Sequence, residues 1–424
     1  MLRKIEGLGL ATRRWAGVGS VALMLMLTGC GGGGGGDSEA TGATATSATT
    51  LSAAAQLGEK IFNDASLSAS GLQSCASCHN ADHGHAPANA LAVQLGGTTG
   101  TDQEGLRNAP GIRYLRYNTA FYVASDGTPT GGFFWDGRAA SLADQAAGPF
   151  LNAREMANAS KAEVVQRLAA SSYAAEFETL YGVGIFNDVD GAYQRMTLAI
   201  QAYEVEDSDF APFTSKYDAF LRGQASLTEQ ELRGLALFNS PSKGNCQACH
   251  PSAKGADGSH PLFTDFSYDA LGVPRNDEIA ANADTSYYDL GLCDSAAISD
   301  LGLNETGRQA LCGLFKVPSL RNVALRQSYF HNGRFHDLKE AITFYVQRDT
   351  NPEKWYLLPG GSVDYASDGS VNKYNDMPEA YRKNVNVTEA PYNRTLGGAP
   401  ALTESEIDDL VAFLGTLSDG WTSP

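Results

Sequence analysis

Two pentapeptides of the pattern Cys-x-x-Cys-His carry the strongest chemical signal in this sequence. Residues 75–79 read Cys-Ala-Ser-Cys-His and residues 246–250 read Cys-Gln-Ala-Cys-His. In this pattern two thiols add to the vinyl groups of one haem, and the histidine that follows can bind the iron. A zinc site would need four ligands at each place, and a redox dithiol would be expected within a βαβ unit. The sequence therefore predicts two covalently bound haems c, with His79 and His250 as iron ligands. The thioether bonds would be formed by Cys75, Cys78, Cys246 and Cys249.

Amphipathic helices are expected to lead into both motifs. Residues 58–62 precede the first motif and residues 234–238 precede the second, and both segments begin with glycine and end with phenylalanine. Thr228 and Glu231 form a capping box that would open the second of these helices. The weak repeat indicates that each haem motif follows a helix.

A C-terminal helix is expected to complete the second half. Thr403 and Glu406 form another capping box, and apolar residues from 407 to 417 then follow one helical face. Residues 191–205 show a similar apolar face and are its expected counterpart in the first half.

Length and composition bound the architecture. The chain has 424 residues, 43% of them hydrophobic and 19% charged, which suits two or three globular domains and rules out wholesale disorder. Its formal charge of −17 argues against nucleic-acid binding and fits either a basic docking partner or simple solubility. After residue 40 no run of 18 apolar residues occurs, so no interior membrane span is expected. We predict a mainly α protein with two cytochrome c-like helical domains, residues 55–225 and 226–424, each with one covalently bound haem c.

The first thirty residues have the pattern of an export signal. Basic residues precede the short apolar run of residues 18–27, so residues 1–29 are predicted to be a signal peptide. The Leu-Thr-Gly-Cys that ends at Cys30 resembles a bacterial lipobox, in which Cys30 is acylated; ordinary secretion with Cys30 unmodified is the alternative. Gly31, rather than Asp, follows Cys30, and this resembles the pattern of lipoproteins that are sorted to the outer membrane. Residues 30–54 would be a flexible tether, and we expect a periplasmic lipoprotein that meets the membrane only through its anchor.

Two further cysteines lie outside the haem motifs. Cys293 and Cys312 are 19 positions apart and would reside in an oxidising compartment, which favours a disulfide. Two separate buried thiols are the alternative.

The remaining histidines bear on whether the haems carry electrons or catalyse a reaction. A haem with both axial positions filled by protein carries electrons, whereas one with an open position beneath acid-base groups can act as a peroxidase. His83 and His85 lie too near His79 in sequence to reach the opposite haem face easily, and His260 is expected in an exposed loop. His331 and His336 complete the set of candidates for a distal ligand.

Several ordered motifs resemble the bacterial dihaem cytochrome c peroxidase family, which includes the MauG-type enzymes. The resemblance runs over about residues 55–417. It is carried, with the two haem motifs, by Phe-Trp-Asp-Gly-Arg at 134–138, Gln145, Gly148-Pro149, Glu155-Met156, Lys-Val-Pro-Ser-Leu-Arg-Asn at 316–322 and Tyr-Phe-His-Asn-Gly at 329–333.

The resemblance implies that the first haem is the peroxidatic one. Glu155 would lie over its open face, take a proton from the near oxygen of hydrogen peroxide and return it to the far one. Gln145 would hydrogen-bond the peroxide, and Trp135 matches an aromatic residue near the haem.

Two departures from the typical family pattern concern the axial ligands. No histidine lies between His85 and His250, so the histidine that caps the first haem in typical members is missing and that haem is expected to be open at rest. The second haem's distal ligand, usually Met, falls at Tyr345, which resembles the MauG-type His/Tyr ligation. The alternative is that Tyr345 is only a packed aromatic side chain.

The resemblance also implies a calcium ion between the domains. Asn108 matches its side-chain ligand, with backbone carbonyls expected near Arg326 and Ser328. Arg326 replaces the usual Thr, a departure at the expected calcium site. Residues 226–250 contain no tryptophan that could bridge the haems, so the sequence leaves the electron path open.

We expect a peroxidase that reduces hydrogen peroxide to water with electrons from a donor protein, a small cytochrome c or a cupredoxin. One alternative is a MauG-like enzyme that uses peroxide to oxidise a residue of a partner protein. The other is a dihaem electron-transfer cytochrome without enzymatic activity.

Overall fold

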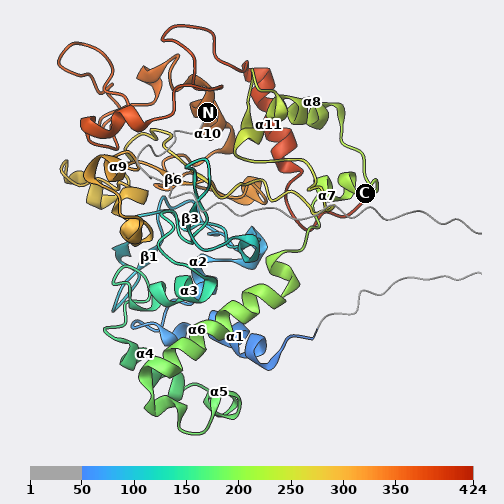
Figure 1. Cartoon of the computed structure of the whole chain (residues 1–424), viewed down its shortest axis with the longest axis vertical. Coiled ribbons are helices and arrows are strands. Elements are labelled where there is room, and N and C mark those ends of the chain that lie inside the picture. The colour runs from blue at the N-terminus through green and yellow to red at the C-terminus, as the bar shows by residue number, and fades with distance from the viewer. Residues whose placement is uncertain (1–49, 424) are drawn as a thin grey trace, which may run out of the picture. The chain divides into compact units, whose positions relative to one another are not determined.

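The computed structural model describes residues 50–423, and most of its regular structure is helical (Figure 1). The α-helices are α1 (Ala53–Asn63), α2 (Cys75–Cys78), α3 (Leu142–Leu151), α4 (Lys161–Ala169), α5 (Ala174–Tyr181), α6 (Val189–Glu206), α7 (Lys216–Leu221), α8 (Glu229–Asn239), α9 (Glu305–Gln309), α10 (Leu338–Gln347) and α11 (Glu404–Gly415). The strands form two-stranded antiparallel ribbons, which are β1 (Leu95–Gly96) with β2 (Gln103–Glu104), β3 (Tyr122–Val123) with β4 (Pro129–Thr130), and β5 (Tyr268–Asp269) with β6 (Phe315–Lys316). The described residues contain no helix long and apolar enough to span a membrane.

In the first half, α1 packs closely against α6 (Figure 1). Gly58 lies at the crossing, where an added Cβ atom would come 1.9 Å from the carbonyl oxygen of Ala199. Only glycine lets the two backbones approach this far. Residues 191–205, which the sequence suggested as a helix, lie within α6. The first haem motif begins in α2, which follows α1 after residues 64–74 and lies against it.

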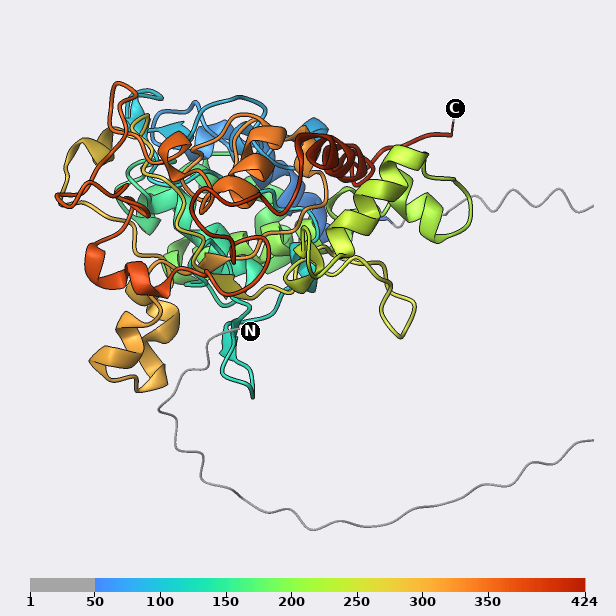
Figure 2. The same cartoon turned by 90° about the horizontal axis from the view of Figure 1, so that it is seen from above.

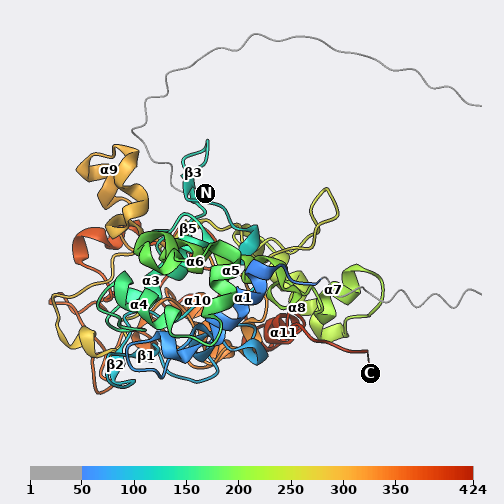
Figure 3. The ribbon, with the colours of Figure 1, turned by 90° about the horizontal axis from the view of Figure 1, so that it is seen from below.

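The second half repeats this arrangement with α8 and α11, which lie side by side in Figures 1 and 3. A Cβ atom on Gly234 would come 2.0 Å from the carbonyl oxygen of Asp409. Both capping boxes suggested by the sequence are present at the starts of these helices. The glycine at each crossing therefore has the same physical role in both halves.

The buried side chains form two large clusters that follow the two halves. One extends in sequence from Leu57 to Phe210, and the other from Tyr217 to Leu417. Helix α7, ahead of the expected boundary at residue 225, packs into the second cluster through Tyr217. Residues from Leu51 onward form one compact unit, and their division into two domains stays a prediction.

A turn of the same geometry precedes α3 and α10. A β-bridge joins Phe133 to Ala139 in the first copy and Tyr329 to Phe335 in the second. In each copy the second residue, a phenylalanine, and the fifth, a glycine, have φ between 62° and 72°. A capping residue follows two positions after each turn, and the helix then begins. Counted from the turn, position 149 of α3 and position 345 of α10 are equivalent.

Two segments project from the rest in Figures 2 and 3. One is the hairpin of β3 and β4, and the other contains α9. The structure joins Cys293 to Cys312 by a disulfide at the base of the α9 segment, which has a small apolar cluster of its own.

Candidate active site

The first haem motif starts in α2 and ends in a histidine whose orientation is fixed by the backbone. Nδ1 of His79 lies 3.2 Å from the carbonyl oxygen of His85 and donates to it when the ring is neutral. Burial lowers the pKa of His79 to about 4, so the imidazole is neutral at physiological pH. A hydrogen bond at Nδ1 leaves Nε2 available to a metal, which is the usual arrangement for a ligating histidine.

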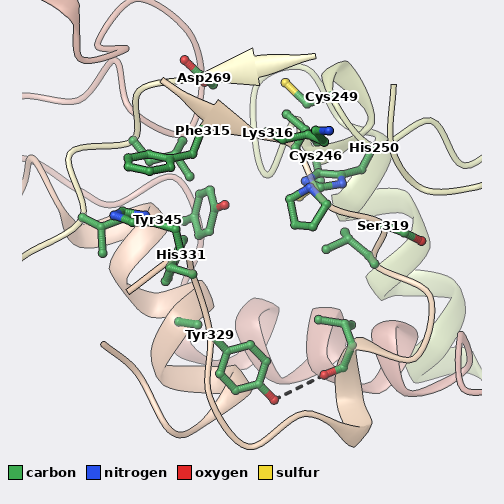
Figure 4. A pocket seen from close by; sticks show the side chains of 18 of the residues that line it. Cys246, Cys249, His250, Asp269, Phe315, Lys316, Ser319, Tyr329, His331 and Tyr345 are labelled. Atoms are coloured by element: carbon green, nitrogen blue, oxygen red, sulfur yellow. Dashed lines mark hydrogen bonds between the residues drawn. The ribbon is translucent and has the colours of Figure 1, made fainter. Parts of the chain in front are cut away.

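The second motif uses the same device. Nδ1 of His250 lies 2.7 Å from the carbonyl oxygen of Phe263, and burial lowers the pKa of its imidazole. Cys246 and Cys249 line the same cavity as His250 (Figure 4). The thiols and the oriented imidazole around an apolar space fit a covalently bound haem.

Tyr345 of α10 lies across this cavity from His250, and its hydroxyl points into the space (Figure 4). The ring packs against Phe330 and Tyr392, with centroid distances of 5.4 Å and 5.8 Å. Within residues 50–423 its hydroxyl makes no hydrogen bond. Burial raises the pKa of the phenol. A cavity-facing phenol without a protein hydrogen-bond partner can supply an axial ligand, and ligation by Tyr345 stays a prediction.

Glu155 follows α3 and is held close to the first haem motif. Its backbone carbonyl accepts a hydrogen bond from Gly97, and a Cβ on Gly96 would come 2.4 Å from that same oxygen. The β1–β2 ribbon therefore lies in close contact with the backbone of the segment that carries Glu155. Nδ2 of Asn152 donates to Oε1 at 2.6 Å.

The Glu155 carboxyl interacts electrostatically with Arg138 and with Cys78 of the first haem motif. Burial raises the pKa of its carboxyl, while the charge of Arg138 and the hydrogen bond from Asn152 act in the opposite direction. After burial, the charge of Glu155 is what raises the pKa of Cys78, to about 11. The carboxyl therefore lies close enough to Cys78 to interact electrostatically with the first haem motif.

Gln145 and Trp135 occupy different parts of the site. Gln145 is partly buried on α3, ten residues before Glu155, and no hydrogen bond joins the two side chains in the described chain. Trp135 donates from Nε1 to the carbonyl oxygen of Asn108 at 2.7 Å. Trp135 belongs to the first half in sequence, yet it lines the cavity that holds the second haem motif.

Comparison with known proteins identifies relatives of this chain. A family model described as di-haem cytochrome c peroxidase matches residues 52–226. Methylamine utilization protein MauG of Paracoccus denitrificans is 34% identical over 372 residues, which cover 87% of this chain and 89% of that protein. Cytochrome c551 peroxidase of Nitrosomonas europaea is 32% identical over 291 residues, 68% of this chain and 71% of the relative. The crystal structure of the diheme peroxidase BthA from Burkholderia thailandensis is similar with a TM-score of 0.78 and 40% identity, covering 87% and 86% of the two chains.

The chain belongs to the dihaem cytochrome c peroxidase and MauG family. It is therefore an oxidoreductase that acts on hydrogen peroxide, and the family implies two c-type haems. Since relatives include both cytochrome c peroxidases and MauG, membership alone leaves the choice between these activities open.

In this family member the residues at the expected calcium site do not fit a calcium ion. Oδ1 of Asn108 accepts a hydrogen bond from Nη2 of Arg326 at 3.0 Å. The carbonyl of Ser328 accepts from Nε of the same guanidinium, and the carbonyl of Arg326 accepts from the hydroxyl of Tyr329. The expected oxygen ligands already have protein donors, and one donor is a cation. These contacts argue against the calcium ion that the sequence resemblance implied.

The other histidines have protein partners. Nε2 of His85 lies 2.6 Å from Oδ2 of Asp209, and its ring stacks on Phe210 with 4.1 Å between centroids. His331 stacks on Phe315 at 3.5 Å, and burial lowers its pKa to about 4. Within the described chain the others contact side chains as well: His83 contacts Asn80, His260 contacts Asp218 and His336 contacts Glu278.

Sequence reasoning missed the buried Lys316. Its ammonium group donates to the carbonyl of Gly132, and burial lowers its pKa to about 7. Lys316 and Trp135 line the same cavity, and the amide of Lys316 donates to the carbonyl of Trp135 at 2.9 Å. The Lys-Val-Pro motif gave its position, but a charged residue in a motif does not reveal burial.

The predicted lipidation site lies outside the described residues. Cys30, the signal peptide of residues 1–29 and nearly all of the tether fall before residue 50.

Proposed function

We propose that this enzyme reduces hydrogen peroxide to water at the first haem site, with electrons from a donor protein such as a small cytochrome c or a cupredoxin. The observation that carries the proposal is the pairing of Glu155 with the first haem motif. The position of α3 equivalent to Tyr345 is Pro149, whose side chain has no atom able to bind iron. The first haem site thus has the carboxyl of Glu155 and no counterpart of Tyr345. The second haem site has Tyr345.

The protein groups would manage the protons of the reaction. When bound, the haem supplies an iron to which peroxide binds and electrons that cleave the O–O bond. Glu155 takes the proton from the near oxygen and delivers it to the far oxygen, so that water leaves. Its raised pKa suits a group that must hold this proton between the two steps. In sum, one peroxide, two protons and two electrons give two waters.

Gln145 and Trp135 are proposed to have distinct roles. Gln145 hydrogen-bonds peroxide or its water from α3. Trp135 provides the aromatic group through which electrons pass between the haem sites, because a first-half residue lines the second cavity. Residues 226–250 contain no tryptophan, so Trp135 is the residue proposed for this role.

A second candidate function is MauG-like oxidation of a residue in a partner protein. The position of Tyr345 across the cavity from His250 favours it. A phenolate is a hard anionic ligand, so it would lower the haem potential and favour the oxidised iron that such chemistry needs.

The cellular setting is proposed from the sequence. We propose that residues 1–29 direct export, that Cys30 carries a lipid and that residues 30–54 tether the enzyme in the periplasm at the outer membrane.

Turnover with a reduced donor separates the two candidates. The holoenzyme is mixed with peroxide and a reduced small cytochrome c, and donor oxidation is followed optically. A peroxidase should oxidise two donors per peroxide at steady state. Negligible donor oxidation, together with peroxide-dependent oxidation of tyrosine or tryptophan in an added protein, would favour the MauG-like function and reject the first candidate.

A further inference from the structure

A guanidinium group lies between the two haem-bearing halves, at the place where the family resemblance implied calcium. Arg326 comes from the second half. Nη2 of its guanidinium donates at 3.0 Å both to Oδ1 of Asn108 and to the carbonyl oxygen of Ala109, which belong to the first half. Its Nε donates at 3.2 Å to the carbonyl of Ser328. One side chain thus collects oxygen atoms from both halves.

These oxygens are the kind that a calcium site uses. Calcium binds amide and carbonyl oxygens, and Asn108 Oδ1 with neighbouring backbone carbonyls would provide such a set. Here the same oxygens solvate a guanidinium, whose planar fork can reach several acceptors at once. A second cation beside it would meet electrostatic repulsion rather than free ligands.

The Arg326 guanidinium is a buried cation that is held by uncharged oxygen atoms. Arg326 forms no ion pair with a carboxylate among residues 50–423, so neutral oxygens hold it. Burial lowers the pKa of the guanidinium to about 10, and it remains charged at neutral pH. Two further hydrogen bonds join Asn108 to the segment that follows Arg326. The backbone amide of Asn108 donates to the carbonyl of His331, and its side-chain Nδ2 donates to the carbonyl of Phe330.

Arg326 also lies near both haem sites. It lines the cavity of the second motif, and its charge helps burial to lower the pKa of His79 in the first. We propose that the Arg326 guanidinium replaces the inter-half calcium ion in this enzyme, which therefore needs no bound calcium to join its two haem sites.

The wild-type holoenzyme provides the first test. It is dialysed against a calcium chelator or against calcium chloride, and its calcium content, melting midpoint and electron paramagnetic resonance spectrum are measured. We expect no stoichiometric calcium, and the same midpoint and spectrum in both buffers. One tightly held calcium per chain, with a lower midpoint or an altered haem spectrum after chelation, would overturn the proposal.

Two variants sharpen the test. The Arg326→Thr variant removes the guanidinium but keeps the oxygens, so its midpoint should fall in chelator and rise again when calcium is added. The matched control is Arg308→Thr, since Arg308 is an exposed arginine paired only at 3.7 Å with Asp294; it should behave as the wild type in both buffers. A chelator-treated Arg326→Thr variant that is as stable as the wild type would also contradict the proposal.

Discussion

The turns before α3 and α10 place two different residues at equivalent positions of the helices that follow. Both copies use a β-bridge, a phenylalanine and a glycine with positive φ, and a capping residue two positions later. The helix that follows carries Pro149 in the first half and Tyr345 in the second. If Tyr345 binds the second haem iron as proposed, this single position distinguishes a filled iron site from one that lacks a protein ligand there.

The chain also takes different courses after α3 and after α10, and Glu155 belongs to the first of these segments. It lies beyond the end of α3, where the chain turns back beneath the β1–β2 ribbon. The corresponding region after α10 instead continues into a buried cluster around Arg348, which packs over Tyr392 at 4.4 Å. The carboxylate that follows α10, Asp349, is therefore paired with Arg348 and Lys373, whereas Glu155 after α3 has Asn152 as its hydrogen-bond partner.

The largest expected effect comes from removing the carboxylate of the first half. The Glu155→Gln variant should lose about 10²–10⁴-fold in kcat/KM for peroxide while it keeps both haems, because proton transfer is lost and the fold is not. Turnover and the haem absorption spectrum are measured together. The control is Glu163→Gln, whose carboxylate pairs with Arg167; undiminished turnover in Glu155→Gln would remove Glu155 from the mechanism.

The second prediction concerns Tyr345 as the proposed ligand of the second haem. The Tyr345→Phe variant keeps the ring packing but loses the oxygen, so the second haem should lose its low-spin ferric signal. Electron paramagnetic resonance of the ferric holoenzyme measures this, with Tyr365→Phe as a control because Tyr365 is exposed. If the low-spin signal persists unchanged, Tyr345 is not an axial ligand and the contrast with Pro149 loses its meaning.

The helix crossings should respond alike in the two halves. Gly58→Ala and Gly234→Ala each force a methyl group against a backbone carbonyl, at 1.9 Å and 2.0 Å, so each should lower the free energy of unfolding by about 1–3 kcal/mol. Chemical denaturation measures the change. In α11 an added Cβ at Gly415 meets nothing within 4 Å, so Gly415→Ala should be neutral or stabilising by up to about 1 kcal/mol. If only one of the two variants lowers the free energy of unfolding, the two helix crossings are not equivalent.

The smallest effect is a pH shift confined to the first half. The base form of Glu155 is the carboxylate, so kcat/KM should fall as the pH drops through its pKa, which burial holds above the usual 4.5. Arg138 opposes this rise, so Arg138→Gln should move the acid limb to higher pH by a fraction of a unit, because the arginine is partly exposed and screened. Arg167→Gln is the control. If the acid limb of kcat/KM stays at the same pH in Arg138→Gln, a group other than Glu155 controls it.

Local sequence patterns predicted the parts of the fold that local chemistry specifies. The helices around residues 58–62, 234–238 and 191–205 follow from apolar periodicity, and two of the caps from Thr-x-x-Glu. The repeated turn has a sequence signal of its own, Phe-x-x-Gly-Arg at both 134–138 and 330–334, but its geometry is visible only in the structure.

The candidate site was predicted less evenly. The haem motifs and Glu155 stand in recognisable patterns, whereas the place of Trp135 depends on contacts between residues far apart in sequence. Arg326 illustrates the limit most clearly. Its identity was visible as a departure from Thr, but only the three-dimensional structure shows that its side chain reaches Asn108, 218 positions away.

The disulfide between Cys293 and Cys312 has a practical consequence for preparing this protein. It accounts for two cysteines, and haem attachment would consume Cys75, Cys78, Cys246 and Cys249. Between residues 50 and 423 a fully matured molecule then retains no alkylatable sulfhydryl. Mass spectrometry after treatment with iodoacetamide would therefore report the fraction of chains whose biogenesis is incomplete and which half failed.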